Sequence, residues 1–298
     1  MNMNEIIKNF KERLNKNDIN TEIGFKHELR EITQELVMAG LSEAGLFDKA
    51  VFHGGTSLRM IYRIARYSED LDFTLLNKDE NFKWKPYLDK VKNFAGEIGC
   101  KLEVLDKSKD NNNVQKAFVK DSSIEQMMNM SWTRKSGSPE KIKIKLEVDT
   151  NPPLYSINEL KIYDFPIKYN INIQNLSSLF SGKCHALLCR EYDKGRDWFD
   201  LNWFVNNNIE PNYKYLNAIL NQQGPWKGKD IHSNKTWICD ELFKKCNTLD
   251  YKGINLDINK FANKTPDVNY NRSTIINIIN GFNSEGYGQH TKNRNNSW

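Results

Sequence analysis

Two aspartates that lie two residues apart are the part of this sequence best suited to chemistry. Asp70 and Asp72 alternate with the apolar Leu71 and Phe73. Successive side chains of a strand point to opposite faces, so a strand here puts both carboxylates on one face and both apolar side chains in the core. Two carboxylates this close repel one another unless a cation compensates them. The spacing therefore predicts a site for a divalent cation.

A glycine pair shortly before the aspartates predicts a second kind of contact. Gly54 and Gly55 follow an apolar run at residues 50–52 and precede a segment with helical periodicity at residues 56–66. Glycine lets the backbone approach a ligand closely, and the N–H groups at the start of a helix attract anions. We therefore expect a phosphate to lie at this corner.

A later segment offers a third carboxylate for the same site. Residues 141–149, KIKIKLEVD, alternate strictly between apolar and charged side chains, as in a strand with one buried face. Glu147 and Asp149 both lie on the charged face, and we prefer Glu147 because apolar neighbours flank it on both sides. The plainer interpretation is a solvent-facing strand whose lysines discourage aggregation.

Two helices further along the chain carry oppositely charged side chains. Lys183 and Arg190 share one face of the first helix, and the next helix carries Asp197 and Asp200 three residues apart. One interpretation is a helical hairpin closed by salt bridges. The other directs Lys183 and Arg190 toward phosphates and lets Asp197 orient the lysine.

The predicted helix at residues 56–66 also has a basic face, formed by Arg59, Arg63 and Arg66. These arginines are either a solvated surface with local ion pairs or include at least one guanidinium that contacts nucleotide phosphates. Ser68, before the first aspartate, either braces that carboxylate, touches a phosphate or serves as a turn residue.

The bulk composition narrows the class of protein. The 298 residues carry 43 Lys and Arg against 38 Asp and Glu, a net charge of +5 that permits a polyanionic partner without requiring one. Five widely spaced cysteines without a CxxC pair argue against a zinc site or a disulfide framework. No apolar run is long enough to span a membrane, and the amino terminus does not resemble a signal peptide, so we expect a cytoplasmic protein.

The coarse pattern predicts two domains. A core-packing helix is expected at residues 22–44 and another at 83–98, with strands at 50–53, 101–105, 115–120 and 125–132. From residue 177 the pattern becomes helical. We therefore predict an α/β domain over residues 1–175 and a mainly helical domain over residues 176–298.

Four blocks of this sequence resemble the motifs of the AbiEii/AbiGii toxin family. They are GGTSLR, RYSEDLDF, KIKLEVD, and KCHALLCR followed by GRDWFDL, and they occur in the family's order across roughly residues 45–205. That family is similar to the DNA polymerase β-like nucleotidyltransferases. The resemblance implies an α+β fold, in which an N-terminal mixed-sheet nucleotidyltransferase domain precedes a C-terminal helical domain.

The resemblance also implies an activity and a set of roles. It implies transfer of a nucleoside monophosphate from an NTP to an acceptor, with RNA such as tRNA favoured, by the toxin of a type IV toxin–antitoxin or abortive-infection system. Mg²⁺, with Mn²⁺ as the alternative, would be the cofactor, and a cognate antitoxin a partner. The implied metal ligands are Asp70, Asp72 and Glu147. Lys183 and Asp197 are further catalytic positions, and the implied nucleotide contacts are Gly54, Gly55, Thr56, Ser68, Lys145 and Arg190, with Asp200 in support.

Two other functions stay open at this point. The same fold could bind nucleotide or RNA without turnover, or it could transfer the nucleotide onto a protein. A binding protein needs no intact set of metal ligands. The presence of Asp70, Asp72 and Glu147 together therefore favours the enzyme.

Overall fold

The computed structural model describes residues 3–16, 21–109, 112–121, 123–124, 142–262 and 268–284. The strand predicted at 125–132, Lys141 and the chain beyond residue 284 lie outside these residues. The chain divides into two compact units. The first unit consists of Met1–Arg63, Tyr67–Pro152 and Glu159–Ile173, and the second of Ile64–Arg66, Pro153–Asn158 and Gln174–Trp298.

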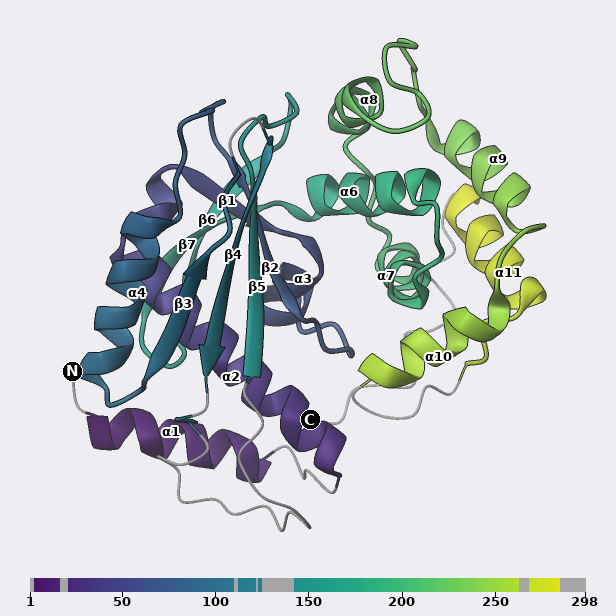
Figure 1. Cartoon of the computed structure of the whole chain (residues 1–298). Helices are drawn as coiled ribbons and strands as arrows, with labels where there is room; N and C mark the ends of the chain where they lie inside the picture. Colours follow the sequence, from purple (N-terminus) through teal and green to yellow (C-terminus); the bar gives the residue numbers. More distant parts are fainter. Residues whose placement is uncertain are drawn as a thin grey trace. The chain divides into compact units, whose positions relative to one another are not determined.

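The first unit is built on a mixed sheet, as the sequence predicted. Its described strands are β1 (Ala50–His53), β2 (Asp70–Leu75), β3 (Leu102–Asp106), β4 (Val114–Asp121), β5 (Ile142–Asp149), β6 (Asn158–Tyr163) and β7 (Tyr169–Gln174). Their order in the sheet is β3-β4-β5-β2-β1-β7-β6 (Figure 1). β2 is parallel to β5 and β1 is parallel to β7, whereas β1/β2, β3/β4 and β4/β5 are antiparallel.

The described helices of this unit are α1 (Met3–Lys16), α2 (Glu22–Glu43), α3 (Gly54–Tyr62) and α4 (Lys85–Glu97), with a short 3-10 helix at Leu46–Asp48. α2 packs against both α4 and β5. Ile32 and Leu36 of α2 are fully buried in the same core as Leu71, Phe73 and Leu146 of the strands. Because side chains alternate along a strand, the carboxylates of β2 lie on the opposite face of the sheet.

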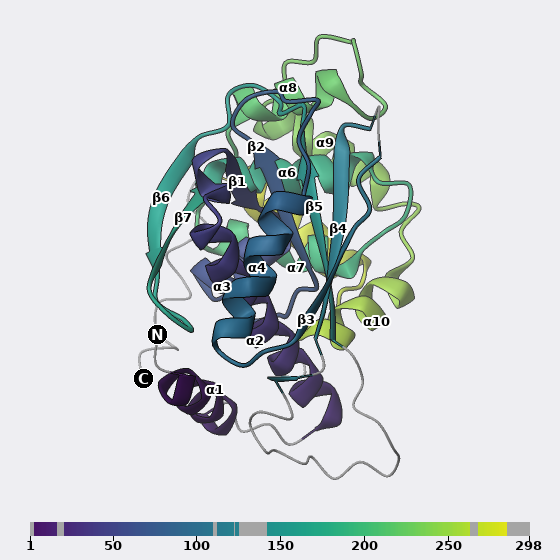
Figure 2. The ribbon, with the colours of Figure 1, turned by 60° about the vertical axis from the view of Figure 1, so that its left-hand side comes forward.

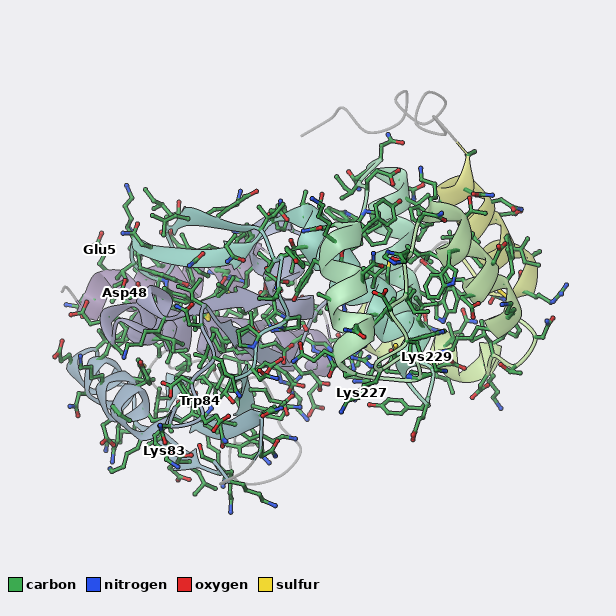
Figure 3. The ribbon with its side chains drawn as sticks, turned by 90° about the horizontal axis from the view of Figure 1, so that it is seen from above. Glu5, Asp48, Lys83, Trp84, Lys227 and Lys229 are labelled. Carbon is green, nitrogen blue, oxygen red and sulfur yellow. The ribbon has the colours of Figure 1, made fainter. Side chains whose placement is uncertain are left out.

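Aromatic side chains close this core. Trp84, directly before α4, is fully buried, and its Nε1 donates a hydrogen bond to the Gln115 carbonyl at 3.1 Å. Its ring centroid lies 5.9 Å from that of Phe73 in an edge-on contact. The neighbouring Lys83 is exposed (Figure 3). The buried indole thereby joins α4 to β4 and β2.

α3 is shorter than the sequence pattern predicted. The helix ends at Tyr62, because Arg63 adopts a left-handed conformation with φ of 56° and terminates the helical hydrogen bonding. Arg66 therefore lies outside the helix, and the predicted continuous basic face does not exist. Arg59 is the only one of the three arginines that lies within α3, and its guanidinium points into the protein.

A buried charge network joins the first three helices. Glu28, Glu31 and Glu35 lie on one face of α2, spaced three and four residues apart, and all three are almost fully buried. Arg59 Nε lies 2.8 Å from Glu31 Oε1. Arg13 of α1 forms ion pairs with all three glutamates. Arg59 thus forms ion pairs, as the first interpretation expected, but it does so in a buried network and not on a solvated surface.

The second unit consists mainly of helices. They are α6 (Leu176–Cys189), α7 (Gly195–Asn206), α8 (Tyr213–Gln222), α9 (Lys235–Lys245), α10 (Tyr251–Phe261) and α11 (Arg272–Asn283). Five of them begin at an Asn or Asp whose side chain accepts a backbone N–H of the first turn, at Asn175, Asn212, Asn234, Asp250 and Asn271. Phe180 and Phe204 stack at 4.4 Å between α6 and α7. In the described ranges no helix is both long and apolar enough to span a membrane.

The network on α2 predicts a pH dependence of stability. Burial is the largest influence on Glu35 and raises its pKa from 4.5 to about 7, although Arg13 acts in the opposite direction. A carboxyl whose pKa is raised in the folded state stabilises that state most below the unfolded pKa, and the contribution disappears as the pH rises through the folded pKa. We expect the free energy of unfolding to fall by up to about 3 kcal/mol between pH 4.5 and 7 through this group.

Urea denaturation of the parent and of Glu35→Gln at several pH values between 4.5 and 7.5 tests this dependence. The variant should lose it, whereas Glu22→Gln, which changes an exposed carboxylate of the same helix, should keep it. Parallel curves for the parent and Glu35→Gln would contradict the assignment.

Candidate active site

The parallel pairing of β2 with β5 places charged residues of the two strands side by side. In this register Asp70 lies opposite Lys145, and Asp72 lies opposite Glu147. All four belong to the face of the sheet opposite the buried Leu71 and Phe73, and all four are partly exposed. Two of the sequence blocks, separated by about seventy residues, therefore meet in adjacent strands, as the predicted metal site requires.

Lysines from two strands neutralise this face. Lys145 Nζ lies 3.0 Å from Asp70 Oδ2 and 3.0 Å from Glu147 Oε2. Lys116, opposite Glu147 in the β4/β5 pairing, places its Nζ 3.0 Å from Glu147 Oε1. Burial raises the pKa of Glu147, but the hydrogen bonds from both lysines outweigh it and hold the pKa below its usual value. Glu147 is therefore an ionised carboxylate at neutral pH.

Asp149, the other candidate for a third metal ligand, lies one row farther along the sheet. It is opposite Thr74 of β2, and its Oδ1 accepts the backbone N–H of Asn151 at 2.9 Å. Burial raises its pKa, against the Asn151 N–H and the charge of His53. Of these two carboxylates, Glu147 is the one directly opposite Asp72. The register thus separates two residues that the alternation pattern left equivalent.

The glycine corner packs directly against the second aspartate. Gly54 has φ of 79°, a left-handed conformation that favours glycine. A Cβ at this position would lie 2.6 Å from Asp72 Oδ2. Gly55 follows in the first turn of α3 and is partly exposed. At the first residue of α3 the backbone therefore lies closer to the Asp72 carboxylate than a residue with a Cβ would allow.

Two further predicted contact residues serve the framework of the first unit. The Thr56 hydroxyl is buried and donates a hydrogen bond to the Asp70 carbonyl, which ties α3 to the start of β2. The Ser68 carbonyl accepts a hydrogen bond from Gln34 Nε2 of α2 at 3.2 Å. Both residues take part in hydrogen bonds at the start of β2 or just before it.

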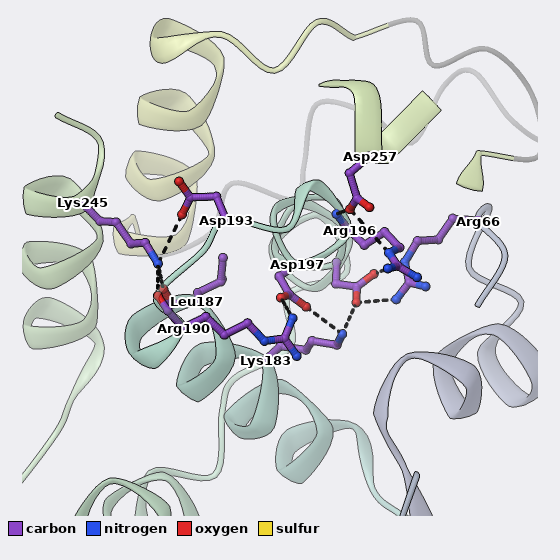
Figure 4. Close-up of polar contacts among 10 residues, drawn as sticks. Arg66, Lys183, Leu187, Arg190, Asp193, Arg196, Asp197, Lys245 and Asp257 are labelled. Atoms are coloured by element: carbon purple, nitrogen blue, oxygen red, sulfur yellow. Dashed lines mark hydrogen bonds and ion pairs between the residues drawn. The ribbon is translucent and has the colours of Figure 1, made fainter. Parts of the chain in front are cut away.

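The second unit holds a compact cluster of alternating charges around Lys183 (Figure 4). Lys183 Nζ lies 3.0 Å from Asp197 Oδ1 and 2.7 Å from Asp200 Oδ2. The two aspartates lie one turn apart on α7 and are almost fully buried. The predicted contact between Lys183 and Asp197 is therefore present, and Asp200 holds the same ammonium from a second direction.

Two arginines complete the cluster. Arg66 is 2% exposed and binds both oxygens of Asp200, at 2.6 Å and 2.5 Å. Arg190 follows the last residue of α6, so it caps that helix, and its Nη1 lies 2.5 Å from Asp197 Oδ2. Burial raises the pKa of Asp197, but Lys183 and Arg190 outweigh it and lower the pKa. Three cations thus surround two carboxylates, which leaves the cluster with a net positive charge.

The start of α7 is held by close packing against α10. A Cβ on Gly195 would lie 2.0 Å from the Ile254 carbonyl, so only glycine fits. The Arg196 N–H donates to Asp257 Oδ2 at 2.9 Å. Lys245 of α9 donates to the Leu187 carbonyl at 2.6 Å, at the end of α6 (Figure 4). These contacts anchor the start of α7 and the end of α6, the two helices that carry Asp197 and Lys183.

The carboxylate face fits a hard divalent cation in its chemistry. Asp70 and Asp72 offer oxygen donors, which Mg²⁺ and Mn²⁺ prefer, and Mg²⁺ commonly takes one or two carboxylates together with water and substrate phosphates. Across the residues that the structure describes, no group of three or more His, Cys, Asp or Glu side chains is gathered tightly enough to hold a metal ion. Here the positive charge beside Asp70 is the Lys145 ammonium.

The structure thus gathers the predicted residues into two groups. Within the first unit lie Gly54, Gly55, Thr56, Ser68, Asp70, Asp72, Lys145 and Glu147, and within the second lie Lys183, Arg190, Asp197 and Asp200. Sequence reasoning missed Lys116, the pairing of Arg66 with Asp200, and Lys245. Lys116 alternates with apolar neighbours in β4, but only the strand register shows which carboxylate it meets.

Comparison with known proteins gives the family context. A family model described as the nucleotidyl transferase AbiEii toxin of a type IV toxin–antitoxin system matches residues 36–272. A structure described as a "putative nucleotidyltransferase from H. pylori" is 18% identical, covers 88% of this chain and 96% of its own, and has a TM-score of 0.50. JHP933 from Helicobacter pylori is 19% identical, covers 88% and 93%, and also has a TM-score of 0.50. No curated protein sequence matches the chain.

The close approach of Gly54 to Asp72 predicts a damaging substitution. Gly54→Ala adds a Cβ 2.6 Å from the carboxylate and imposes a left-handed conformation on alanine, which costs about 1–2 kcal/mol. We expect a loss of stability of that order in urea denaturation and displacement of the Asp72 side chain. Gly96→Ala in α4 is the control, because nothing lies within 4 Å of its added methyl group. Equal stability of the two variants would refute the packing argument.

Proposed function

The chain belongs to the AbiEii family of nucleotidyl transferase toxins of type IV toxin–antitoxin systems, and from that premise we propose its substrates and cofactor. The proposed reaction transfers a nucleoside monophosphate from an NTP to an RNA acceptor, such as tRNA, in the presence of Mg²⁺. The observation that carries the proposal is the register of β2 with β5, which places Asp70, Asp72 and Glu147 on one face of the sheet.

We assign the metal to the aspartates of β2. Asp70 and Asp72 would hold Mg²⁺, or Mn²⁺ in its place, and the bound ion would neutralise charge that develops at the transferred phosphoryl group and lower the pKa of the attacking hydroxyl. Glu147 is the proposed third carboxylate. Its ion pairs with Lys145 and Lys116 keep it charged and fix its direction. The Lys145 ammonium lies 3.0 Å from Asp70. When a cation binds Asp70, this ammonium could leave the carboxylate and contact a phosphate of the nucleotide instead.

The glycine corner of the first unit and the lysine cluster of the second unit are each assigned a phosphate-contacting role, as the family resemblance implies. The backbone at Gly54 and Gly55 would approach a phosphate at the start of α3, where the N–H groups of a helix favour an anion. Lys183 would neutralise triphosphate charge, with Asp197 and Asp200 holding its ammonium in one direction. Arg190, 35% exposed, is the other cation of the cluster that remains accessible to a phosphate.

Partners follow from the same proposal. A toxin of a type IV system implies a cognate antitoxin, and the net charge of +5 is compatible with an RNA acceptor. Both NTP and tRNA are available in the cytoplasm, which is the proposed location. A protein acceptor is the alternative, and an acceptor-free assay with labelled NTP distinguishes self-modification from transfer to RNA.

Removing one aspartate tests the proposed reaction. Asp70→Asn keeps the size of the side chain but removes its charge, so transfer from labelled NTP to RNA should fall by at least about a hundredfold. Asp89→Asn, in an exposed ion pair of α4, should leave transfer unchanged. Circular dichroism and thermal unfolding should show both variants folded. Equal transfer by Asp70→Asn and the parent, or transfer that persists in EDTA, would rule out metal-assisted catalysis at this face.

A matched pair of variants tests the third carboxylate. Glu147→Gln removes the charge opposite Asp72, whereas Asp149→Asn removes a carboxylate that is one row away. We expect Glu147→Gln to reduce the rate of transfer strongly and to raise the Mg²⁺ concentration at half-maximal rate, while Asp149→Asn changes either quantity less than about threefold. The reverse ranking would assign the role to Asp149.

A further inference from the structure

β6 is an edge strand with exposed apolar side chains. It is the last strand of the sheet among the described residues, and Figure 2 shows it at the rim of the sheet. Leu160 is 72% exposed and Ile162 is 66% exposed. Both point to the same face of the strand, because they lie two residues apart. Proteins usually protect such an edge, since its unpaired backbone groups and apolar side chains can pair with another strand.

The opposite edge of the sheet is protected in the usual way. β3 has one exposed apolar side chain, Leu105, at 43%; it lies two residues after the acidic Glu103 and directly before Asp106. Acidic side chains on an edge repel a second copy of the same strand. β6 carries one charge of each sign, Glu159 and Lys161, so whether two copies of this strand repel one another depends on the register in which they pair.

The charges of β6 are complementary to themselves. Glu159 and Lys161 flank Leu160 and point to the other face of the strand, where Lys161 lies over the Tyr62 ring of α3 at 5.5 Å. Their side chains form an ion pair at 3.0 Å and are about 40% exposed. In an antiparallel pair, the side chains of directly opposite residues lie on the same face of the sheet. If two copies of β6 pair about a two-fold axis perpendicular to the sheet, one residue must therefore lie directly opposite the same residue of the other copy, with the axis midway between them.

Each axis position has a different electrostatic outcome. An axis at Glu159 sets two carboxylates opposite each other, and an axis at Lys161 sets two ammonium groups opposite each other, which destabilises both pairings. An axis at Leu160 places Glu159 of each copy opposite Lys161 of the other. It also sets the two Leu160 side chains directly opposite each other. Ile162 of each copy is then the diagonal neighbour of Leu160 of the other copy.

We propose that two copies of this chain associate through antiparallel pairing of their β6 strands, with the two-fold axis at Leu160. The pairing satisfies the outward backbone groups of both edges and covers Leu160 and Ile162. It converts two intramolecular ion pairs into one group of four alternating charges. A symmetric contact of this kind closes on itself and yields a dimer instead of a fibre. The inference does not depend on the proposed enzymatic function.

Sedimentation equilibrium of the full chain tests the dimer. The parent should sediment at twice 34.9 kDa at micromolar concentrations. Leu160→Lys sets two ammonium groups across the axis and should give a single-chain mass. Because Leu160 is largely exposed, the variant should keep the circular dichroism spectrum of the parent. Leu105→Lys on β3 is the matched control, and it should remain dimeric.

A charge exchange tests the register. Glu159→Lys alone and Lys161→Glu alone should each weaken dimerisation by about tenfold or more, because each creates two like-charge pairs. The double variant Glu159→Lys/Lys161→Glu restores opposite charges and should recover the dimer. A double variant as weak as the single ones would overturn the register. A parent that sediments as one chain would overturn the proposal itself and leave the β6 edge to a strand of another protein, such as an antitoxin.

Discussion

The parallel pairing of β2 with β5 is the constraint on which the carboxylate face depends. A shift of one residue in this register would turn every charged side chain of β5 into the core and every apolar one out of it. The buried Leu146 and Val148 therefore hold Glu147 in place as firmly as its own ion pairs do. The same register aligns Asp70 with Lys145. The backbone hydrogen bonds between β2 and β5 thus fix both the positions of the charged side chains and the packing of the core beneath them.

Buried charge in this protein is compensated at short range in both units. The three glutamates of α2 meet Arg13 and Arg59, and the two aspartates of α7 meet three cations. An uncompensated buried charge costs several kcal/mol, so each of these groups also determines how its helices pack. The two networks differ in sign. The α2 network has more carboxylates than arginines, and burial raises the pKa of Glu35, whereas the α7 network has more cations than carboxylates.

Close backbone approach positions the functional groups in each unit. Gly54 lets the chain touch the Asp72 carboxylate, and Gly195 lets the start of α7 touch α10. Thr56 then links the beginning of α3 to β2 through the Asp70 carbonyl. The residues that make these contacts lie in the same short stretches of chain that carry the family motifs. The motif residues therefore include partly exposed charged side chains, such as Asp70 and Asp72, and buried residues that hold them in position, such as Thr56.

Local alternation was enough to predict that Asp70 and Asp72 share one face and that Leu71 and Phe73 are buried. The motif order identified the family, and helical periodicity located α2 and α4 to within about two residues. These features depend on neighbours in the chain, so a sequence contains them directly. The end of α3 was predicted wrongly, because a left-handed Arg63 has no counterpart in the pattern of apolar residues.

Only the tertiary structure decided which distant side chains meet. Arg59 and Arg66 had the same predicted role, yet one binds Glu31 of α2 and the other binds Asp200 of α7. Glu147 and Asp149 were equivalent by alternation, and the register with β2 separated them. Lys116 showed no functional signal until its pairing with β5 was known. Periodicity assigns a face to a side chain, but strand register and helix packing, which depend on the whole core, assign its partner.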